Sequence, residues 1–451
     1  MWFKVNDTIV AISTALGEGA ISIIRVSGDD AIKIINPLFD GKDLEKASSH
    51  TINYGHIVYN GEIIDEVLLS IMKAPKTYTK EDVIEINTHG SIAVVNKIME
   101  ILLLEGCRLA EPGEFTKRAF LNGRIDLTES EGVMDLINSE TELTRKMAIN
   151  ELSGNVSRLI TDTREDIISL ISNIEVNIDY PEYEDIEVVT INKIREKVRE
   201  IKEKLLKTLK LSEDGKILKD GIKTVILGKP NVGKSSLLNA LLEEEKAIVT
   251  DVKGTTRDIV EGSILVGGVK LNLIDTAGVR KSDDIVEKIG IEKSLSLIDE
   301  AELVLLILDA SCHLSEEDKY LLEKTKDKKR IIIMNKIDLN LNNSYMDDVI
   351  KISAKNNEGI EDIKDAIKKL FNVGTFMSKN LTFFTNVRQI SLLKSAIKSL
   401  EDVEQGIKEE REIDMIEIDL KLVWEKLGDI IGANYTEELI DNLFSRFCLG
   451  K

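Results

Sequence analysis

The stretch Gly228-Lys229-Pro230-Asn231-Val232-Gly233-Lys234-Ser235 decides the fold of the middle of this chain. It has the spacing G-x-x-x-x-G-K-S, follows the apolar run 224–227 and precedes a helical pattern over 236–242. A strand, a glycine-rich loop and a helix in this order are typical of a phosphate-binding loop. The glycines let backbone N–H groups close around phosphate oxygens, and the helix N-terminus adds positive potential. The sequence therefore predicts a P-loop nucleotide site.

Three side chains of this loop have predicted roles. We expect Lys234 to neutralise the β- and γ-phosphates and the Ser235 hydroxyl to bind Mg²⁺. The amide oxygen of Asn231 could coordinate a monovalent cation beside the phosphates, doing the work of a missing arginine finger. The other predicted nucleotide contacts in this segment are Val232, Gly233 and Ser236.

Two further motifs follow in the order that a nucleotide hydrolase requires. Gly254-Thr255-Thr256-Arg257-Asp258 lies in a predicted loop, where Thr256 can give the metal a second hydroxyl. Asp275-Thr276-Ala277-Gly278 ends a predicted strand. We expect Asp275 to hold Mg²⁺ through water and the Gly278 N–H to contact the γ-phosphate.

The base is predicted to be guanine. Asn335-Lys336-Ile337-Asp338 follows the predicted strand 331–334. The Asp338 carboxylate can accept both the ring N–H and the exocyclic amino group of guanine, whereas adenine offers no such donor pair. Ser353-Ala354-Lys355 then closes the base pocket. Five motifs in this order predict a GTPase with a Ras-like P-loop domain.

The residue that positions the attacking water is not the usual one. Val279 follows Gly278, where Ras-like proteins have a glutamine that orients water. Glu287, within 283–289, is the nearest acidic candidate for this role. The alternative interpretation is that Glu287 is an ordinary surface glutamate.

Composition restricts the class of protein. The chain has 451 residues, with 60 Lys and Arg against 80 Asp and Glu, a net charge of −20. At about 150 residues per domain, this length predicts about three domains. We expect a cytoplasmic protein without a membrane span, because no apolar window approaches ~20 residues and the start lacks a signal peptide. The three cysteines, Cys107, Cys312 and Cys448, are too few and too scattered for a disulfide framework or a zinc site.

The pattern of apolar residues changes three times along the chain. Residues 1–120 are predicted to be mixed α/β, 121–215 helical with a last helix over about 191–212, and 376–451 helical again. Residues 216–375 alternate strands and helices, which is typical of a parallel sheet with helical crossovers. We predict that 121–215 and 376–451 form one helical domain into which the α/β domain is inserted. The predicted strands of the inserted domain are 224–227, 271–274, 303–308, 331–334 and 349–352.

Beyond the nucleotide motifs, the chain resembles the MnmE (TrmE) family of tRNA-modification GTPases at both ends. The N-terminal marks are Asp7-Thr8-Ile9-Val10-Ala11, Ile23-Ile24-Arg25-Val26-Ser27-Gly28 and the stretch 112–124, PGEFTKRAFLNGR. The C-terminal mark is Phe447-Cys448-Leu449-Gly450-Lys451. The resemblance implies an N-terminal α+β domain that binds folate and dimerises, a helical domain in two sequence halves, and an inserted GTPase domain.

The resemblance also implies a cation-dependent mechanism. Family members bind K⁺ through the phosphate-loop asparagine, which is Asn231 here, with backbone groups around Thr250, Val252 and Thr255. K⁺ promotes dimerisation of the GTPase domains and hydrolysis, with a glutamate that matches Glu287. The implied nucleotide contacts in the loop are Thr250, Asp251, Val252, Lys253, Gly254, Thr255 and Thr256.

Together with the FAD-containing protein MnmG, in a heterotetramer, the family modifies C5 of the wobble uridine of certain tRNAs. The added group is of the aminomethyl or carboxymethylaminomethyl type, and 5-formyl- or methylene-tetrahydrofolate supplies its one-carbon unit. The folate residues implied here are Arg25, Glu85, Arg124 and Lys451. Cations suit the glutamate tail of folate, and a carboxylate suits its pterin. Arg25 and Glu85 could instead be charges on a sheet surface.

Cys448 has two interpretations. It lies near the terminus and could be catalytic, but a nucleophile requires a lowered pKa. It could equally be a small buried apolar residue beside Phe444 and Phe447.

The competing function is that of a K⁺-dependent ribosome-assembly GTPase. Such proteins usually carry an RNA-binding module rich in Lys and Arg, and we find none in the sequence. The charge of −20 also disfavours a protein that binds RNA alone, because phosphate binding needs concentrated Lys and Arg. We therefore expect a partner to hold much of the tRNA.

Overall fold

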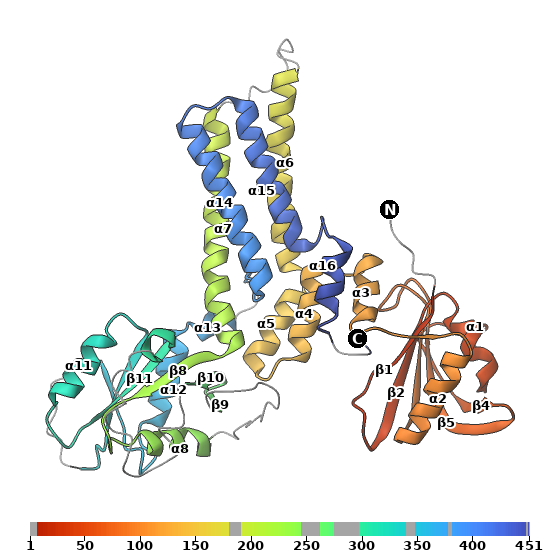
Figure 1. Cartoon of the computed structure of the whole chain (residues 1–451), viewed down its shortest axis with the longest axis horizontal. Helices are drawn as coiled ribbons and strands as arrows, with labels where there is room; N and C mark the ends of the chain where they lie inside the picture. Colours follow the sequence, from red (N-terminus) through yellow and green to blue (C-terminus); the bar gives the residue numbers. More distant parts are fainter. Residues whose placement is uncertain are drawn as a thin grey trace. The chain divides into compact units, whose positions relative to one another are not determined.

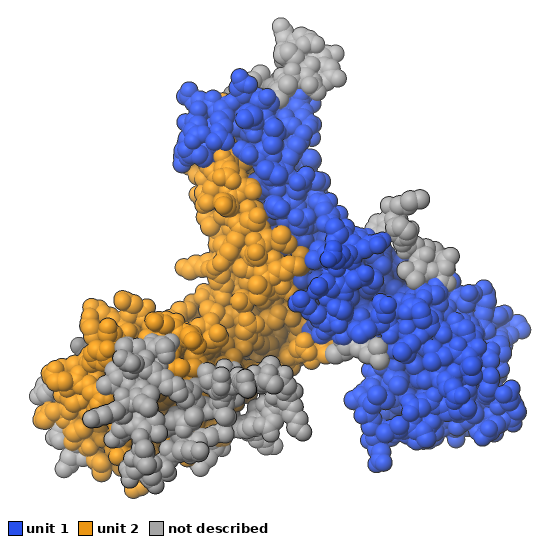
Figure 2. All heavy atoms as spheres, viewed as in Figure 1, with its two compact units in different colours: residues 1–134, 157–189, 405–451 blue, residues 135–156, 190–404 orange. Residues whose placement is uncertain are grey.

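The computed structural model describes residues 7–179, 191–244, 262–274, 297–339, 348–377, 381–447 and 450 (Figure 1). The chain divides into two compact units, coloured separately in Figure 2. Unit 1 contains Met1–Met134, Ser157–Val189 and Gln405–Lys451, and unit 2 contains Asp135–Val156 and Thr190–Glu404. Each unit thus combines segments that are distant in sequence. No described helix is long and apolar enough to cross a membrane.

Unit 1 is built on a seven-stranded sheet with the order β3-β4-β5-β6-β2-β1-β7. Neighbouring strands are antiparallel, except for β1 and β7, which are parallel. The strands are β1 (Ile9–Ile12), β2 (Gly19–Ser27), β3 (Phe39–Asp40), β4 (Thr51–Tyr59), β5 (Glu62–Met72), β6 (Val83–Gly90) and β7 (Arg108–Leu109).

The two faces of this sheet have different partners because side chains alternate along each strand. Ile24 on β2 and Ile86 on β6 belong to a core that also contains residues of α1 (Ala31–Ile35), η1 (Asn36–Leu38) and α2 (Ile92–Leu104). Arg25 and Glu85 are paired in register between these inward positions, so their side chains lie on the opposite face. The sheet therefore brings two predicted site residues together on one surface.

Besides α1, η1 and α2, unit 1 contains helices from residues 114–179 and 413–444. They are α3 (Glu114–Leu121), most of α4 (Leu127–Ile137), most of α6 (Asn155–Asp179), α15 (Ile413–Ile431) and α16 (Glu437–Phe444). Phe120 on α3 shares a core with Phe444 on α16 and with Phe447. An ion pair of 2.5 Å between Lys117 and Asp441 joins the same two helices. Helix α16 thereby carries the chain end back to the N-terminal region.

Unit 2 contains a six-stranded sheet with the order β13-β12-β11-β8-β10-β9. All neighbouring strands are parallel except β9 and β10, which form an antiparallel hairpin. The five predicted strands are confirmed, whereas β9 was not predicted. The strands are β8 (Ile222–Leu227), β9 (Gly262–Val266), β10 (Val269–Leu273), β11 (Leu303–Asp309), β12 (Arg330–Asn335) and β13 (Val349–Lys351).

Helices cover both faces of this sheet. Alternate β11 residues such as Leu305 pack in a core with α8 (Lys234–Glu244) and α12 (Ile360–Leu370). The intervening residues, such as Leu306, pack in a second core with α11 (Glu316–Lys324). A strand buried on both faces explains the continuous apolar run seen in the sequence.

The remaining helices of unit 2 are α5 (Glu142–Leu152), α7 (Ile191–Asp220), α13 (Val373–Phe376) and most of α14 (Val387–Lys408). Helix α7 ends at Asp220, so the predicted end near 212 is wrong. Gly215 looks like a helix breaker, but it lies at a close contact, where an added Cβ would be 3.1 Å from Phe376 Cε1. Packing therefore explains this glycine and lets the helix continue almost to β8.

Candidate functional site

The phosphate loop connects the end of β8 to the start of α8. Three of its residues have positive φ: Gly228 (147°), Asn231 (61°) and Gly233 (99°). An added Cβ would lie 2.4 Å from the Ile307 carbonyl oxygen at Gly228, and 2.2 Å from the Asn335 amide nitrogen at Gly233. The two glycines are therefore required by space as well as by conformation, whereas asparagine tolerates the left-handed region.

Asn335, at the end of β12, connects the phosphate loop to the base-binding segment. Its Nδ2 donates to the Val232 carbonyl oxygen at 2.8 Å, and its Oδ1 accepts from the Ala354 N–H at 3.0 Å. A carboxamide donates through its NH₂ group and accepts through its oxygen, so one planar side chain serves both contacts. The structure thus joins two of the predicted motifs through one buried side chain.

Lys234 lies inside the loop. Its Nζ donates to the carbonyl oxygens of Gly228 and Lys229 at 2.7 and 2.8 Å. Burial lowers the pKa of Lys234, which is the effect expected for an ammonium group withdrawn from water. A bound phosphate would supply the missing counter-charge at this position.

The cation donors of the loop fit the metals predicted for them. Ser235 follows Lys234 on the first turn of α8, and Asn231 lies within the loop itself. Their hydroxyl and amide oxygens are the hard donors that Mg²⁺ and monovalent cations accept. The other predicted metal donors, Thr250, Val252, Thr255 and Thr256, lie outside the described residues.

The residues predicted to read the base are held by partly buried polar contacts. The Ser353 hydroxyl lies 2.7 Å from Asp338 Oδ1, which fixes the orientation of this carboxylate. Lys336 Nζ forms a 2.6 Å ion pair with Asp309, the last residue of β11. Burial alone would raise the pKa of Asp309, but the hydrogen bonds from Lys336 and Ser311 outweigh it and lower that pKa. Sequence reasoning predicted no role for Asp309, although an acidic residue at the end of a buried strand could have suggested one.

The structure therefore gathers three of the five nucleotide motifs at the carboxyl edge of the parallel strands. These are 231–236, 335–338 and 353–355, which follow β8, β12 and β13 respectively. The remaining predicted nucleotide and catalytic residues lie outside the described residues: Thr250, Asp251, Val252, Lys253, Gly254, Thr255, Thr256, Asp275, Thr276, Ala277, Gly278, Glu287 and Cys448.

The residues predicted to bind folate include an ion pair between the neighbouring strands β2 and β6 of unit 1. Arg25 Nε donates to Glu85 Oε1 at 2.9 Å, and Arg25 Nη1 donates to the Gly450 carbonyl oxygen at 3.1 Å. Ser13 Oγ donates to the same carbonyl oxygen at 3.2 Å. The chain end thus lies beside two of the residues predicted to bind folate. Lys451, the next residue, lies outside the described residues.

Arg124 follows helix α3 in the sequence and is connected to it through Tyr78. Its guanidinium carbon lies 4.7 Å from the centre of the Tyr78 ring, and the Tyr78 hydroxyl is 2.9 Å from Thr116 Oγ1. The neighbouring residue Phe115 lies under the Arg25 guanidinium, 5.6 Å from ring centre to carbon. Consecutive residues of α3 therefore contact the surroundings of both arginines.

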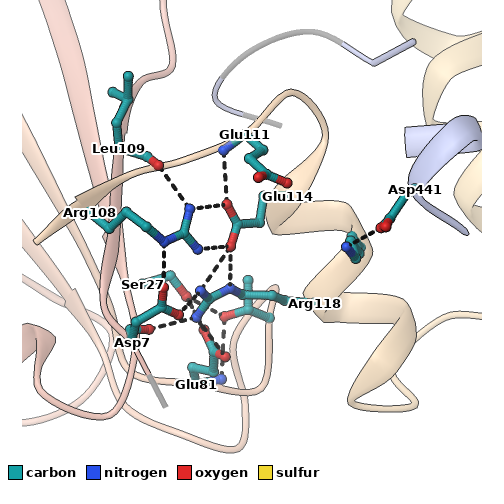
Figure 3. A network of polar contacts seen from close by, with 11 residues as sticks. Asp7, Ser27, Glu81, Arg108, Leu109, Glu111, Glu114, Arg118 and Asp441 are labelled. Carbon is teal, nitrogen blue, oxygen red and sulfur yellow. Dashed lines mark hydrogen bonds and ion pairs between the residues drawn. The ribbon is translucent and has the colours of Figure 1, made fainter. Parts of the chain in front are cut away.

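A buried ion network holds α3 against the sheet (Figure 3). Arg118 is 2% exposed and forms ion pairs with Asp7, Glu114 and Glu81 at 2.6, 2.9 and 3.2 Å. Arg108 pairs with Asp7 and Glu114, both at 2.5 Å. Sequence reasoning assigned no role to these residues, because the pairs of Arg118 with Asp7 and Glu81 join segments that are distant in sequence.

A cavity of about 170 Å³ in unit 2 lies apart from the predicted site residues. Its lining includes the ion pair of Asp135 and Lys219 and the hydroxyl of Thr385, and contains none of the residues predicted to bind nucleotide. We assign it no role in nucleotide binding.

Comparison with known proteins assigns the chain to a family. A model described as the MnmE helical domain matches residues 127–448, and one described as the GTP-binding protein TrmE N-terminus matches residues 8–124. The tRNA modification GTPase MnmE of Streptococcus thermophilus (strain CNRZ 1066) is 53% identical over 453 residues, covering 99% of each chain. The chain belongs to the MnmE family. The MnmE of Streptococcus mutans is 51% identical over 449 residues, also covering 99% of each chain.

Membership of the MnmE family agrees with the fold. The predicted fold class is confirmed: an N-terminal α+β domain, a discontinuous helical domain and an inserted Ras-like P-loop domain. Among solved structures, the G domain of the T. maritima FeoB iron transporter is 29% identical. That match covers 33% of this chain and 98% of that chain, with a TM-score of 0.24 that is too low to support the assignment.

Proposed function

We propose that this MnmE-family chain hydrolyses GTP to support modification of the wobble uridine in certain tRNAs. The observation that carries the proposal is end-to-end similarity to curated tRNA modification GTPases, over 99% of each chain. A phosphate loop and a guanine-reading carboxylate in one unit support the GTP hydrolase activity. The domain boundaries that we propose are 1–120, 121–215, 216–375 and 376–451.

In this proposal each predicted residue of the nucleotide site, whether or not it is among the described residues, acts on one part of GTP or its cations. Lys234 binds the β- and γ-phosphates, and Asp338 reads the guanine edge. Ser235 and Thr256 ligate Mg²⁺, while Asp275 holds it through water. Asn231 would hold K⁺, and this cation and Mg²⁺ would supply charge neutralisation at the phosphates when bound. Glu287 orients the attacking water.

The K⁺ proposal predicts that GTP turnover is roughly tenfold or more faster in K⁺ than in Na⁺, because charge stabilisation at a phosphate is worth at least this factor. Replacing Asn231 with alanine should remove most of the difference between the two salts. The measurement is phosphate release in matched KCl and NaCl buffers. Equal wild-type rates in the two salts would contradict the cation role.

We further propose that Arg25, Glu85, Arg124 and Lys451 bind a reduced folate, 5-formyl- or methylene-tetrahydrofolate. The carboxylate of Glu85 suits the donor edge of a pterin, and the cations suit the glutamate tail. The position of Gly450 beside Arg25 supports the inclusion of the C-terminal lysine. Cys448 stays a candidate catalytic residue, and its neighbour Gly450 lies near this site.

The open face of the unit 1 sheet supports the proposed homodimer. Ile52, Tyr54 and Leu68 are 69%, 62% and 46% exposed, and they lie on the same face of neighbouring strands. Contiguous exposed apolar side chains of this kind are typical of protein interfaces. We propose that a second copy of this chain covers them.

We propose that the cytoplasmic assembly includes MnmG, as a heterotetramer, with tRNA as its substrate. The net charge of −20 supports a shared task, because an acidic chain repels RNA phosphates and needs a partner to hold tRNA.

A further inference from the structure

We propose that Asp318, on α11, is a positioning residue of the GTP site, which fixes the phosphate loop through the side chain of Lys229. This inference rests on the proposed GTPase function and adds a residue outside the five nucleotide motifs. Its basis is a chain of contacts in unit 2 that runs from α11 to the ammonium group of Lys234.

The first contact is an ion pair between α11 and the phosphate loop. Lys229 Nζ lies 2.6 Å from Asp318 Oδ2, and the two side chains are 20% and 3% exposed. Lys229 is the second residue of the loop, directly after Gly228. A nearly buried carboxylate therefore holds the side chain at the start of the loop, in surroundings where solvent screens the pair only weakly.

The second contact leads from the same residue to the phosphate-binding lysine. The backbone carbonyl oxygen of Lys229 accepts a hydrogen bond from Lys234 Nζ at 2.8 Å. The position of this carbonyl depends on the conformation of residue 229, whose side chain is tied to Asp318. Asp318 thus influences the resting position of Lys234 without touching the nucleotide.

Helix capping alone does not account for an ionised residue at this position. Asp318 Oδ2 also accepts hydrogen bonds from the Ser315 N–H and hydroxyl, both at 2.9 Å, in a capping box. Asp318 Oδ1, however, is buried without a hydrogen-bond partner among the described residues. Burying a charge with an unpaired oxygen is costly unless a close opposite charge compensates it. Lys229 is that charge.

The phosphate loop also contacts two strands of the sheet, whereas Asp318 contacts it from a helix. Gly228 packs against the Ile307 carbonyl of β11, and Asn335 of β12 binds the Val232 carbonyl. Asp318 adds an attachment from helix α11 to the next residue of the loop, Lys229. The loop is therefore held at its start, by β11 and α11, and near its end, by β12.

The test is a double-mutant cycle on nucleotide affinity in the full chain. The variants are Lys229→Met, Asp318→Asn and both together, and the measurement is the Kd for a fluorescent GDP analogue. We expect each single variant to bind about tenfold more weakly, which is within the range for residues in direct contact. We expect the double variant to have the same affinity as the single variant that binds GDP less tightly. The reason is that both substitutions break the same ion pair.

Controls separate positioning from general loss of structure. Lys319→Met removes an exposed ion pair with Glu316 on the same helix and should leave the Kd unchanged. Lys229→Arg should restore most of the affinity, since it keeps the charge. Thermal unfolding of the nucleotide-free variants shows whether the fold is intact, and Lys229→Met keeps the test valid if Asp318→Asn does not fold.

Two outcomes would overturn the positioning role: unchanged affinity in Lys229→Met, or additive losses in the double variant. Failure of the underlying GTPase function looks different, because the wild-type chain would then bind neither GDP nor GTP.

Discussion

Replacing Asp338 with asparagine is expected to abolish the preference for guanine and to make xanthine nucleotides the better ligands. In the proposed site the Asp338 carboxylate accepts two N–H groups of guanine, whereas the asparagine amide would present one acceptor and one donor. Xanthine carries a carbonyl oxygen in place of the exocyclic amino group and can accept from this amide. Loss of a paired hydrogen bond in a site built for it should weaken GDP binding by roughly a hundredfold or more.

The measurement is competition between GDP and XDP for a fluorescent nucleotide. Asparagine keeps an oxygen for the Ser353 hydroxyl, which lies 2.7 Å from Asp338 Oδ1 in the wild-type chain, so the pocket should stay folded. Asp348→Asn is the matched control, since Asp348 is an exposed residue just before β13. An Asp338→Asn variant that still prefers GDP would show that another group reads the base.

Replacing Arg118 with leucine is expected to lower the free energy of unfolding of the region around α3 by about 3–5 kcal/mol. The guanidinium is 2% exposed and pairs with Asp7, Glu81 and Glu114. Its removal takes the ion pair from Glu81 and leaves Asp7 and Glu114 with Arg108 as their remaining guanidinium partner. Glu81 and Glu114 are largely buried, so the loss of a counter-charge beside them is costly. Urea unfolding at neutral pH measures the loss.

Arg446→Leu is the control in the same unit, because Arg446 is exposed and its guanidinium donates a 3.2 Å hydrogen bond to the neutral side chain of Asn442. It should change stability by no more than about 0.5 kcal/mol. Equal losses in the two variants would contradict the importance of the Arg118 network.

The same network makes stability depend on pH. Burial alone would raise the pKa values of Asp7 and Glu114, but hydrogen bonds from Arg108 and Arg118 outweigh it and lower both from their usual 3.8 and 4.5. A lowered folded-state pKa contributes stability that is fully present above the unfolded pKa and lost as the pH falls through the folded value. The wild-type chain should therefore lose this stability below about pH 4.5, and Arg118→Leu should lose less.

Local patterns correctly predicted the strand and the helix on either side of the phosphate loop. The G-x-x-x-x-G-K-S spacing fixes a strand, a loop and a helix within one short segment, and the structure has β8, the loop and α8 in those places. Asn335 and Asp338 were found for the same reason, because their motif directly follows a strand that is apolar on both faces. Their local sequence is sufficient to place them at the carboxyl edge of the sheet.

Contacts between distant segments could not be predicted in this way. The partners of Arg118 include Asp7 and Glu81, and the partner of Lys229 is Asp318, far along the chain. Nothing in the spacing of these residues reveals the pairing, which depends on tertiary packing. The pairing of Arg25 with Glu85 depends on strand register, and family resemblance, rather than residue pattern, drew attention to both. The predicted end of α7 near 212 was too early. The helix continues past Gly215, which lies at a close packing contact.

We propose above that GTP hydrolysis by this chain supports modification of wobble uridines in tRNA. The most direct measurement is nucleoside mass spectrometry of tRNA from source cells that lack the gene, carry the wild-type gene, or carry a Lys234→Ala gene. We predict that C5-modified wobble uridines disappear without the gene, return with the wild-type chain and stay absent with Lys234→Ala. Unchanged wobble uridines in cells lacking the gene would contradict the account, and accumulation of ribosome precursors there would favour a ribosome-assembly GTPase instead.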